Sequence, residues 1–220
     1  MRSTFLAWTH VISTYLLAAV AGLVTGAGLI IAIGPQNIYV IRQGVSGAYV
    51  LPVIAVCVVS DIVLISAGTA GLGALVSAHP SAVAIAEVVG GGYLLVLAAL
   101  AARRALRPGS GPAHSGSGSG SGRTVGLWAA LGTALALTWL NPHTYLDTVL
   151  TLGSIANSHG GAKWSFTIGA CTASLIWFLM LGLGARRMAP VFASARAWRV
   201  LDTAIAAVMA ALGVMLIAGA

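Results

Sequence analysis

The stretch VISTYLLAAVAGLVTGAGLIIAIGPQN, residues 11–37, is a long apolar run that ends at a proline followed by two side-chain amides. About 20 helical residues cross the roughly 30 Å hydrocarbon core of a bilayer, so the run is long enough to span a membrane. It leads into Gly34, Pro35, Gln36 and Asn37 and not into the small-residue cleavage site of a signal peptide. We therefore expect a retained membrane helix that is broken at its proline.

The composition of the chain excludes a water-soluble domain. Of its 220 residues 59% are hydrophobic and only 7% are charged, whereas about a quarter of the residues of soluble domains are charged. The net charge of +7 would suit a nucleic-acid partner, but the cations lie almost entirely between apolar runs, where they act as topology signals. We expect a lipid bilayer around the chain and no nucleic acid.

The predicted fold class is an all-α polytopic membrane protein with six transmembrane helices. Helices are favoured because an unpaired backbone polar group is costly in lipid. The last segment is short and the fourth is interrupted by a proline. The six segments of spanning length are residues 11–33, 49–74, 82–102, 125–152, 164–185 and 200–218.

A linker divides the chain into two parts. Residues 107–123 contain a Ser/Gly alternation without side chains that could form a core, which is typical of a flexible coil. We expect a first three-helix repeat at residues 1–106 and a second at residues 124–220. The number of chains in the assembly stays open, a homo-oligomer included.

The arginines predict the orientation of the chain, because cytoplasmic loops retain Lys and Arg. The side opposite the arginine-rich loops carries only Arg2 and Lys163. We expect a plasma (inner) membrane protein of a bacterium, with the arginine-rich loops cytoplasmic and both termini extracytoplasmic. The amino terminus is cytoplasmic if the first segment does not span fully. The arginines of the first, third and fifth connections are Arg42, Arg103, Arg104, Arg107, Arg123, Arg186, Arg187, Arg196 and Arg199.

The two parts resemble each other. Each opens with an apolar helix broken by a proline, at Pro35 in the first and at Pro142, between Asn141 and His143, in the second. A repeat with an odd number of spans enters the membrane from the opposite face, so the pattern predicts two inverted repeats, as in many secondary transporters. Chance matching of Gly- and Ala-rich sequences is the alternative. A shift of 114 positions pairs Cys57 with Cys171, Ser60 with Ser174 and Gly68 with Gly182, and a shift of 115 pairs Glu87 with Asp202.

The proline breaks are candidate sites for binding a polar solute. A proline inside a span frees a backbone carbonyl, which is tolerated only where protein or a wet cavity satisfies it. The amides of Gln36, Asn37 and Asn141 are suited to that task and to binding a solute. A mere kink at Pro35 or Pro142 is the alternative.

Asp61 and Asp147 are the candidate charged groups. Asp61 lies near the middle of the second segment, where an ionised carboxylate costs about 2.5 to 3.5 kcal/mol to insert. Protonation, a proton relay or a cationic substrate would compensate for this cost; the structural alternative is a hydrogen bond between helices, with Ser60 or Asn37 as partner. Asp147 follows the second break together with Tyr145 and His143.

Glu87 and Asp202 lie near helix ends, where we expect structural roles. The chain shows no spacing typical of metal ligands, no phosphate loop and no nucleophile-base pair. We therefore expect that the protein is not an enzyme and binds no metal or cofactor. We expect the energy for transport to come from ion or substrate gradients.

Four stretches resemble the bacterial lysine/arginine exporter family called LysE, including its arginine-exporting branch: GPQNIYVIRQG at 34–44, CVVSD at 57–61, TWLNPHTYLDTV at 138–149 and SLIWF at 174–178. The resemblance implies export of L-arginine or L-lysine from the cytoplasm, driven by the proton gradient or the membrane potential. It covers nearly the whole chain outside the linker and a short amino-terminal extension. Buried carboxylates at Asp61 and Asp147 suit such a cation.

Three alternatives remain open. The transported solute could be a neutral amino acid or a metal cation instead of a basic amino acid. The protein could also be a passive channel. A membrane thiol oxidoreductase is the alternative from another class, because Cys57 and Cys171 occupy matching positions, although neither has a Cys-x-x-Cys pattern.

Overall fold

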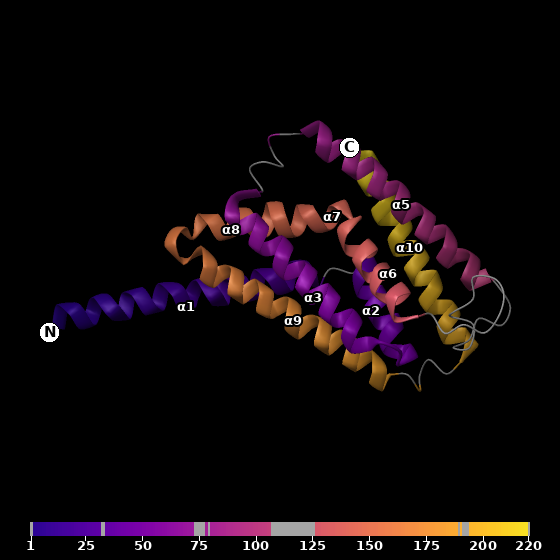
Figure 1. The fold of residues 1–220 in the computed structure, drawn as a ribbon, viewed down its shortest axis with the longest axis horizontal. Coiled ribbons are helices and arrows are strands. Elements are labelled where there is room, and N and C mark those ends of the chain that lie inside the picture. Colours follow the sequence, from indigo (N-terminus) through magenta and orange to yellow (C-terminus); the bar gives the residue numbers. More distant parts are fainter. Residues whose placement is uncertain are drawn as a thin grey trace. The chain divides into compact units, whose positions relative to one another are not determined.

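The computed structural model describes residues 2–31, 34–72, 78, 80–106, 126–188, 190 and 194–219. Every secondary-structure element in this part of the chain is a helix, which confirms the all-helical class (Figure 1). The predicted linker at 107–123 lies outside the described residues. The elements are α1 (Arg2–Ile30), α2 (Pro35–Ser46), α3 (Val50–Ala67), η1 (Gly68–Leu72), α5 (Pro80–Leu106), α6 (Leu127–Trp139), α7 (Pro142–Tyr145), η3 (Leu146–Leu152), α8 (Gly153–Ser158), η4 (Gly160–Ala162), α9 (Lys163–Arg187) and α10 (Ala195–Gly219).

Four described helical stretches are long and apolar enough to cross a membrane, namely Val11–Ile30, Val50–Leu72, Gly160–Arg187 and Asp202–Gly219. Two shorter apolar stretches, Val88–Arg103 and Leu127–Trp139, coincide with parts of the third and fourth predicted segments. The fourth segment is divided among α6, α7 and η3. The helical membrane class therefore agrees with the structure, whereas six spans and inverted repeats stay predictions.

The chain forms two compact units. Unit 1 comprises Met1–Ala32, Val58–Pro80 and Thr144–Trp177, and unit 2 comprises Ile33–Cys57, Ser81–His143 and Phe178–Ala220. Each unit draws residues from both sides of the predicted linker. We describe each unit by itself.

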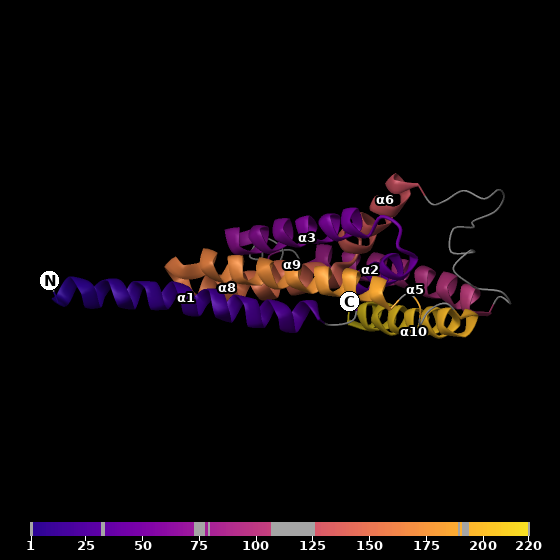
Figure 2. The ribbon, with the colours of Figure 1, turned by 90° about the horizontal axis from the view of Figure 1, so that it is seen from below.

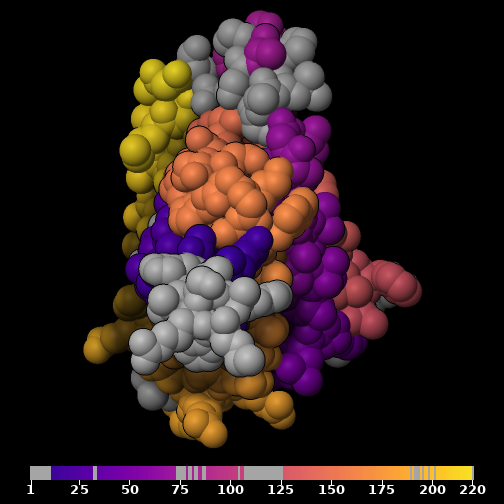
Figure 3. Space-filling view, turned by 90° about the vertical axis from the view of Figure 1, so that its left-hand side faces the viewer, coloured from indigo at the N-terminus to yellow at the C-terminus, as the bar shows by residue number. Residues whose placement is uncertain are grey.

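Unit 1 is held together by close packing of α1 on α9 (Figure 2). A Cβ atom at Gly22 would overlap the backbone carbonyl of Phe166, and one at Gly169 would overlap the carbonyl of Ala19. Glycines let helix backbones approach in lipid, where van der Waals packing replaces the hydrophobic effect. α1 also packs on η3 and η4, and α8 on η1 (Figure 3). The buried apolar residues of this unit include Ala18, Ile65, Leu152, Ala156, Ala162, Phe166 and Ala170.

Unit 2 contains α2, α6, α10 and nearly all of α5, together with residues 50–57 of α3 and 178–187 of α9, and has a second apolar cluster. α5 and α10 run side by side (Figure 1), and a Cβ atom at Gly91 would lie 2.8 Å from the carbonyl oxygen of Gly213. α2 packs on both α6 and α10. The buried members of the cluster are Ile38, Ala98, Ala101, Leu137, Ile205 and Met209.

Large apolar side chains cover the outside of the helices. On α1, Ile12, Leu16 and Leu17 are more than 60% exposed, at 62%, 64% and 68%. Water would not tolerate such a continuous apolar face, whereas lipid tails would cover it. This surface supports the expected bilayer.

Candidate functional site

The first proline marks the start of a new helix in unit 2. α1 ends at Ile30 and α2 begins at Pro35, with Gly34 in extended conformation before it. Proline suits the first helical position because its φ angle is preset and its missing N–H would have no partner inside the helix. No side chain caps the amino end of α2, so backbone N–H groups of its first turn are left to other partners.

Gln36 carries a buried polar atom without a partner. Its Nε2 is shielded from solvent and makes no hydrogen bond to any described residue. A buried amide in this condition costs about 1 to 3 kcal/mol, which is recovered if an acceptor arrives. Asn37, the next residue, is buried as well, with 6% exposed.

Two side chains that the sequence reading did not single out fix α2 against α6. The Tyr39 hydroxyl donates to the carbonyl oxygen of Ala130 at 3.1 Å, and Gln43 Nε2 donates to the Tyr39 oxygen at 2.7 Å. Tyr39 and Gln43 are four residues apart and so lie on one face of the helix. The four-residue spacing of Tyr39 and Gln43 is the feature of the sequence that could have predicted this contact.

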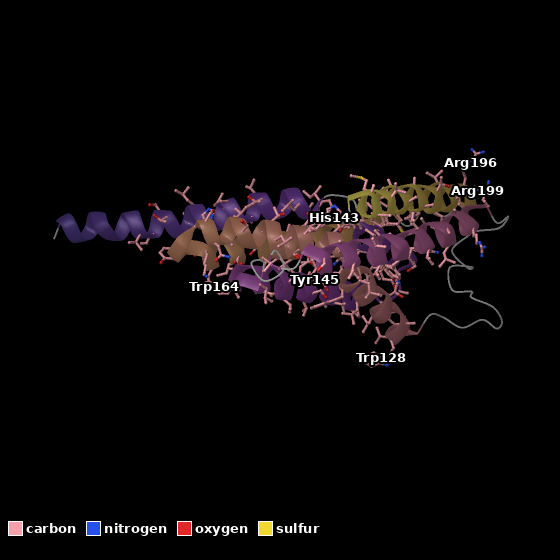
Figure 4. The ribbon with its side chains drawn as sticks, turned by 90° about the horizontal axis from the view of Figure 1, so that it is seen from above. Trp128, His143, Tyr145, Trp164, Arg196 and Arg199 are labelled. Atoms are coloured by element: carbon pink, nitrogen blue, oxygen red, sulfur yellow. The ribbon has the colours of Figure 1, made fainter. Side chains whose placement is uncertain are left out.

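The second proline also starts a helix. α6 ends at Trp139 and α7 begins at Pro142, and the Oδ1 atom of Asn141 accepts the backbone N–H of His143 at 3.2 Å. Asn141 therefore serves as the amino-terminal cap of α7, a role that suits asparagine. A Cβ atom at Gly90 would overlap the Pro142 ring, so α5 packs directly on this break. His143 follows the cap (Figure 4) and is partly exposed.

Both breaks belong to unit 2. Ile38, three residues after Pro35, and Leu137, four residues before Asn141, lie in the same buried cluster. Residues close to the two helix breaks, which are far apart in sequence, thus pack in one cluster. Helix ends of this kind expose backbone dipoles that can hold a polar ligand.

Asp61 is a buried carboxylate of unit 1, with 3% of its surface exposed. Its Oδ2 accepts a 2.7 Å hydrogen bond from the hydroxyl of Ser174, which is completely buried on α9. The sequence suggested Ser60 or Asn37 as a partner, which stays a prediction, and Ser174 is a partner that it did not suggest. The shift of 114 positions pairs Ser174 with Ser60, and this match was the available signal. Ser60 itself is also buried.

Asp147 lies in a π-helical segment, which the sequence did not reveal. The segment η3 contains a hydrogen bond from Thr151 Oγ1 to the carbonyl of Leu146 at 2.9 Å, five residues back. Such wide turns cost stability and are frequent at functional sites. Asp147 is half-buried, and so is Tyr145 just before the segment (Figure 4).

A second π-helical segment packs on the first. A Cβ atom at Gly68 of η1 would lie 2.5 Å from the carbonyl oxygen of Val149 in η3. Nearby, the hydroxyls of Thr69 and Thr167 share a 2.7 Å hydrogen bond, and Lys163 Nζ donates to Asn157 Oδ1 at 3.3 Å. Unit 1 thus has irregular helices and a polar cluster that the sequence did not predict.

The candidate residues are divided between the units. Asp61, Ser60, Tyr145 and Asp147 belong to unit 1, whereas Gln36, Asn37, Asn141 and His143 belong to unit 2. The described part of the chain contains no group of three or more His, Cys, Asp or Glu side chains that could hold a metal ion. Cys57 and Cys171 are not joined in a disulfide, and Cys57 is completely buried.

Comparison with known proteins places these features in a family. Residues 27–219 match the family model of the LysE type translocator. The chain belongs to the LysE family. A lysine exporter LysE of Corynebacterium efficiens is 38% identical to it over 90% of this chain and 97% of the relative. An arginine exporter protein ArgO of an Enterobacter species is 37% identical over 86% of this chain and 87% of the relative.

A protein of Mycobacterium tuberculosis whose name assigns it provisionally to amino-acid transport is 43% identical to this LysE-family chain over 85% of this chain and 90% of the relative. No solved structure matches the chain. The names of these LysE and ArgO relatives describe exporters. Family membership and the apolar helices together indicate a multi-pass bacterial membrane protein.

Proposed function

We propose that this LysE-family chain exports the basic L-amino acids arginine and lysine across the bacterial plasma membrane, driven by the proton gradient or the membrane potential. The observation that carries the proposal is the carboxylate of Asp61, which is buried in a candidate span and hydrogen-bonded to Ser174. The names of the LysE and ArgO relatives support this choice of substrate.

Charge is the reason for assigning a cation to Asp61. The Ser174 hydroxyl donates to one oxygen of the carboxylate and carries no charge itself. A carboxylate inside a membrane requires a proton or a cation to offset its insertion cost. The side-chain ammonium or guanidinium of the cargo, or a coupling proton, fits that requirement. Asp147 is the second acidic candidate for the same task.

The amino end of α2 suits the carboxylate of an amino acid. Its N–H groups lack a side-chain cap, and Gln36 Nε2 is a buried donor without a partner. A helix amino terminus carries a partial positive charge, and broken helices of transporters use it to bind substrate carboxylates. We assign the cargo's polar backbone groups to Gln36 and Asn37, with Asn141, His143, Tyr145 and Ser60 as further contacts.

Inverted repeats would give the exporter alternating access. The repeats at residues 1–106 and 124–220 would each contribute three spans, six in all, and Pro35 and Pro142 would open the backbone at matching places. In this orientation the arginine-rich loops face the cytoplasm and both termini lie outside. Asp61 would belong to the first repeat and its partner Ser174 to the second.

The test is efflux of labelled arginine from cells that overproduce the chain, compared with Asp61→Asn and Asp147→Asn variants of equal abundance. We expect at least about a tenfold loss of efflux for Asp61→Asn, since a charge-assisted interaction of about 1.5 kcal/mol or more is removed. Thr172→Ala on α9 is the matched control, because its hydroxyl bonds only locally to the carbonyl of Ile168. Efflux at the wild-type rate in both Asp variants would contradict the site.

Counterflow separates the proposed cargo from other solutes. Vesicles preloaded with arginine should accumulate labelled arginine, and external lysine should compete. Competition by threonine or cadmium without competition by arginine would identify a different solute. Arginine flux that is independent of both the proton gradient and the membrane potential would indicate a passive channel.

A further inference from the structure

Asp202 is a second buried carboxylate, and it lies in unit 2. It stands at the start of the α10 candidate span with only 2% of its surface exposed. Arg42 of α2 places its Nη1 atom 3.4 Å from Asp202 Oδ1. The sequence predicts a structural role for Asp202, and its ion pair with Arg42 is one such role.

The ion pair is of a kind that can be exchanged. Strong pairs of guanidinium and carboxylate have N–O distances of about 2.7 to 2.9 Å, shorter than the 3.4 Å between Arg42 and Asp202. The Arg42 side chain is 16% exposed, whereas that of Asp202 is 3% exposed. The arginine can therefore move into water, while the carboxylate cannot.

The surroundings of Asp202 are strongly basic. Arg199 lies one turn before it on α10 and is exposed, as is Arg196 (Figure 4). Among the described side chains of unit 2, Asp202 is the single carboxylate. These arginines repel an incoming cation, whereas the Asp202 carboxylate attracts it.

We propose that Asp202 is a binding site for the side-chain cation of the cargo, in which the cargo's guanidinium or ammonium replaces that of Arg42. The proposal rests on the proposed export of basic amino acids. The guanidinium of Arg42 is the same chemical group as that of free arginine, so Asp202 pairs with a group of the chemistry proposed for the cargo.

The exchange has an order that follows from burial. Leaving a buried carboxylate without a cation is strongly unfavourable, so the cargo must arrive as Arg42 departs. Arg42 keeps the site neutral when no cargo is bound. An uncharged amino acid cannot take its place, and the site thereby selects for charge.

The first test measures export in proteoliposomes as a function of arginine concentration on the loading side. The double variant Arg42→Gln with Asp202→Asn removes both members of the ion pair together. We expect its half-saturating arginine concentration to rise about tenfold, the effect of losing one charge-assisted hydrogen bond. Inhibition by citrulline, the uncharged analogue of arginine, should not change. Thr203→Ala is the control, since its exposed hydroxyl bonds only to the Arg199 carbonyl.

The second test uses the wild-type chain and does not depend on how the double variant folds. Phenylglyoxal modifies exposed guanidinium groups, and peptide mass spectrometry reports each arginine separately. Saturating lysine should speed the modification of Arg42 severalfold and leave Arg196 unchanged, and norleucine, which lacks the ammonium, should have no effect. No acceleration by lysine would overturn the proposal.

The outcomes separate the two proposals. Export of arginine by the wild-type chain, with an unchanged half-saturating concentration in a monodisperse double variant, overturns the Asp202 site alone. No export of arginine or lysine by the wild-type chain overturns the proposed function and the Asp202 site with it.

Discussion

Replacing Ser174 with alanine tests whether the bond between α9 and Asp61 supports transport. The change removes the 2.7 Å hydrogen bond and leaves a buried acceptor with one donor fewer. Hydrogen bonds between membrane helices contribute about 0.6 kcal/mol on average and up to about 1.7 kcal/mol, while bonds to a charged group contribute about 1.5 to 3 kcal/mol in general. We expect a loss of about 1 to 2 kcal/mol.

The loss should appear in transport as well as in stability. If Ser174 orients Asp61 toward the cargo, about 1 to 2 kcal/mol corresponds to roughly a fivefold to thirtyfold fall in the ratio of maximal rate to half-saturating concentration. Ser174→Thr keeps the hydroxyl and should recover most of the activity. Arginine efflux from proteoliposomes, with thermal unfolding in detergent beside it, measures both quantities.

Thr172→Ala on the same helix is the matched control. Its hydroxyl donates only along α9, to the Ile168 carbonyl, so stability and efflux should stay near wild-type values. Wild-type efflux in Ser174→Ala would refute the role of this bond in transport. A stability loss without any change in efflux would reduce Ser174 to a structural residue.

Three further substitutions test the packing and the two breaks. Gly22→Ala should destabilise the chain by about 1 to 3 kcal/mol in thermal unfolding, because the new Cβ atom overlaps the Phe166 carbonyl. Gly28→Ala is the control and should be neutral or stabilising, because no atom lies within 4 Å of its new Cβ atom. Gln36→Met should raise the unfolding temperature, since it removes a buried unpaired amide, yet lower arginine efflux; unchanged efflux would argue against a binding role. Asn141→Ala should cost about 0.5 to 2 kcal/mol by removing the cap of α7, and Asn141→Ser should restore most of it; equal stability of the two would show that the cap is unimportant.

The membrane helices and the helix breaks were predictable, because they depend on residues that are close together in the sequence. Long apolar runs predicted membrane helices because each residue contributes to the transfer free energy wherever its partners lie. Proline predicted the starts of α2 and α7 because it constrains its own backbone and its missing N–H. The π-helical turns at Gly68–Leu72 and Leu146–Leu152 were not predictable, since a π turn depends on what packs against it.

The candidate residues show the same division. Burial of Asp61 followed from its place in an apolar run, but its partner did not, because 113 positions separate Asp61 from Ser174. Asn141 was predicted to face a solute, and the structure uses its Oδ1 to cap a helix. The position of Arg42 between two apolar runs predicted a topology signal. Its ion pair with Asp202 was not predictable, because it depends on the packing of α2 on α10.

The sequence by itself determined that this chain is an all-helical membrane protein of the LysE family, because hydropathy, proline positions and motif identity belong to the chain regardless of how it folds. Tertiary structure decided which buried charges have partners and which glycines allow helices to touch. These features depend on distances between residues far apart in sequence. A carboxylate in an apolar run predicts that the folded chain supplies it with a partner. Only the packing of the helices shows that Asp61 accepts a hydrogen bond from a hydroxyl and that Asp202 forms an ion pair with a guanidinium.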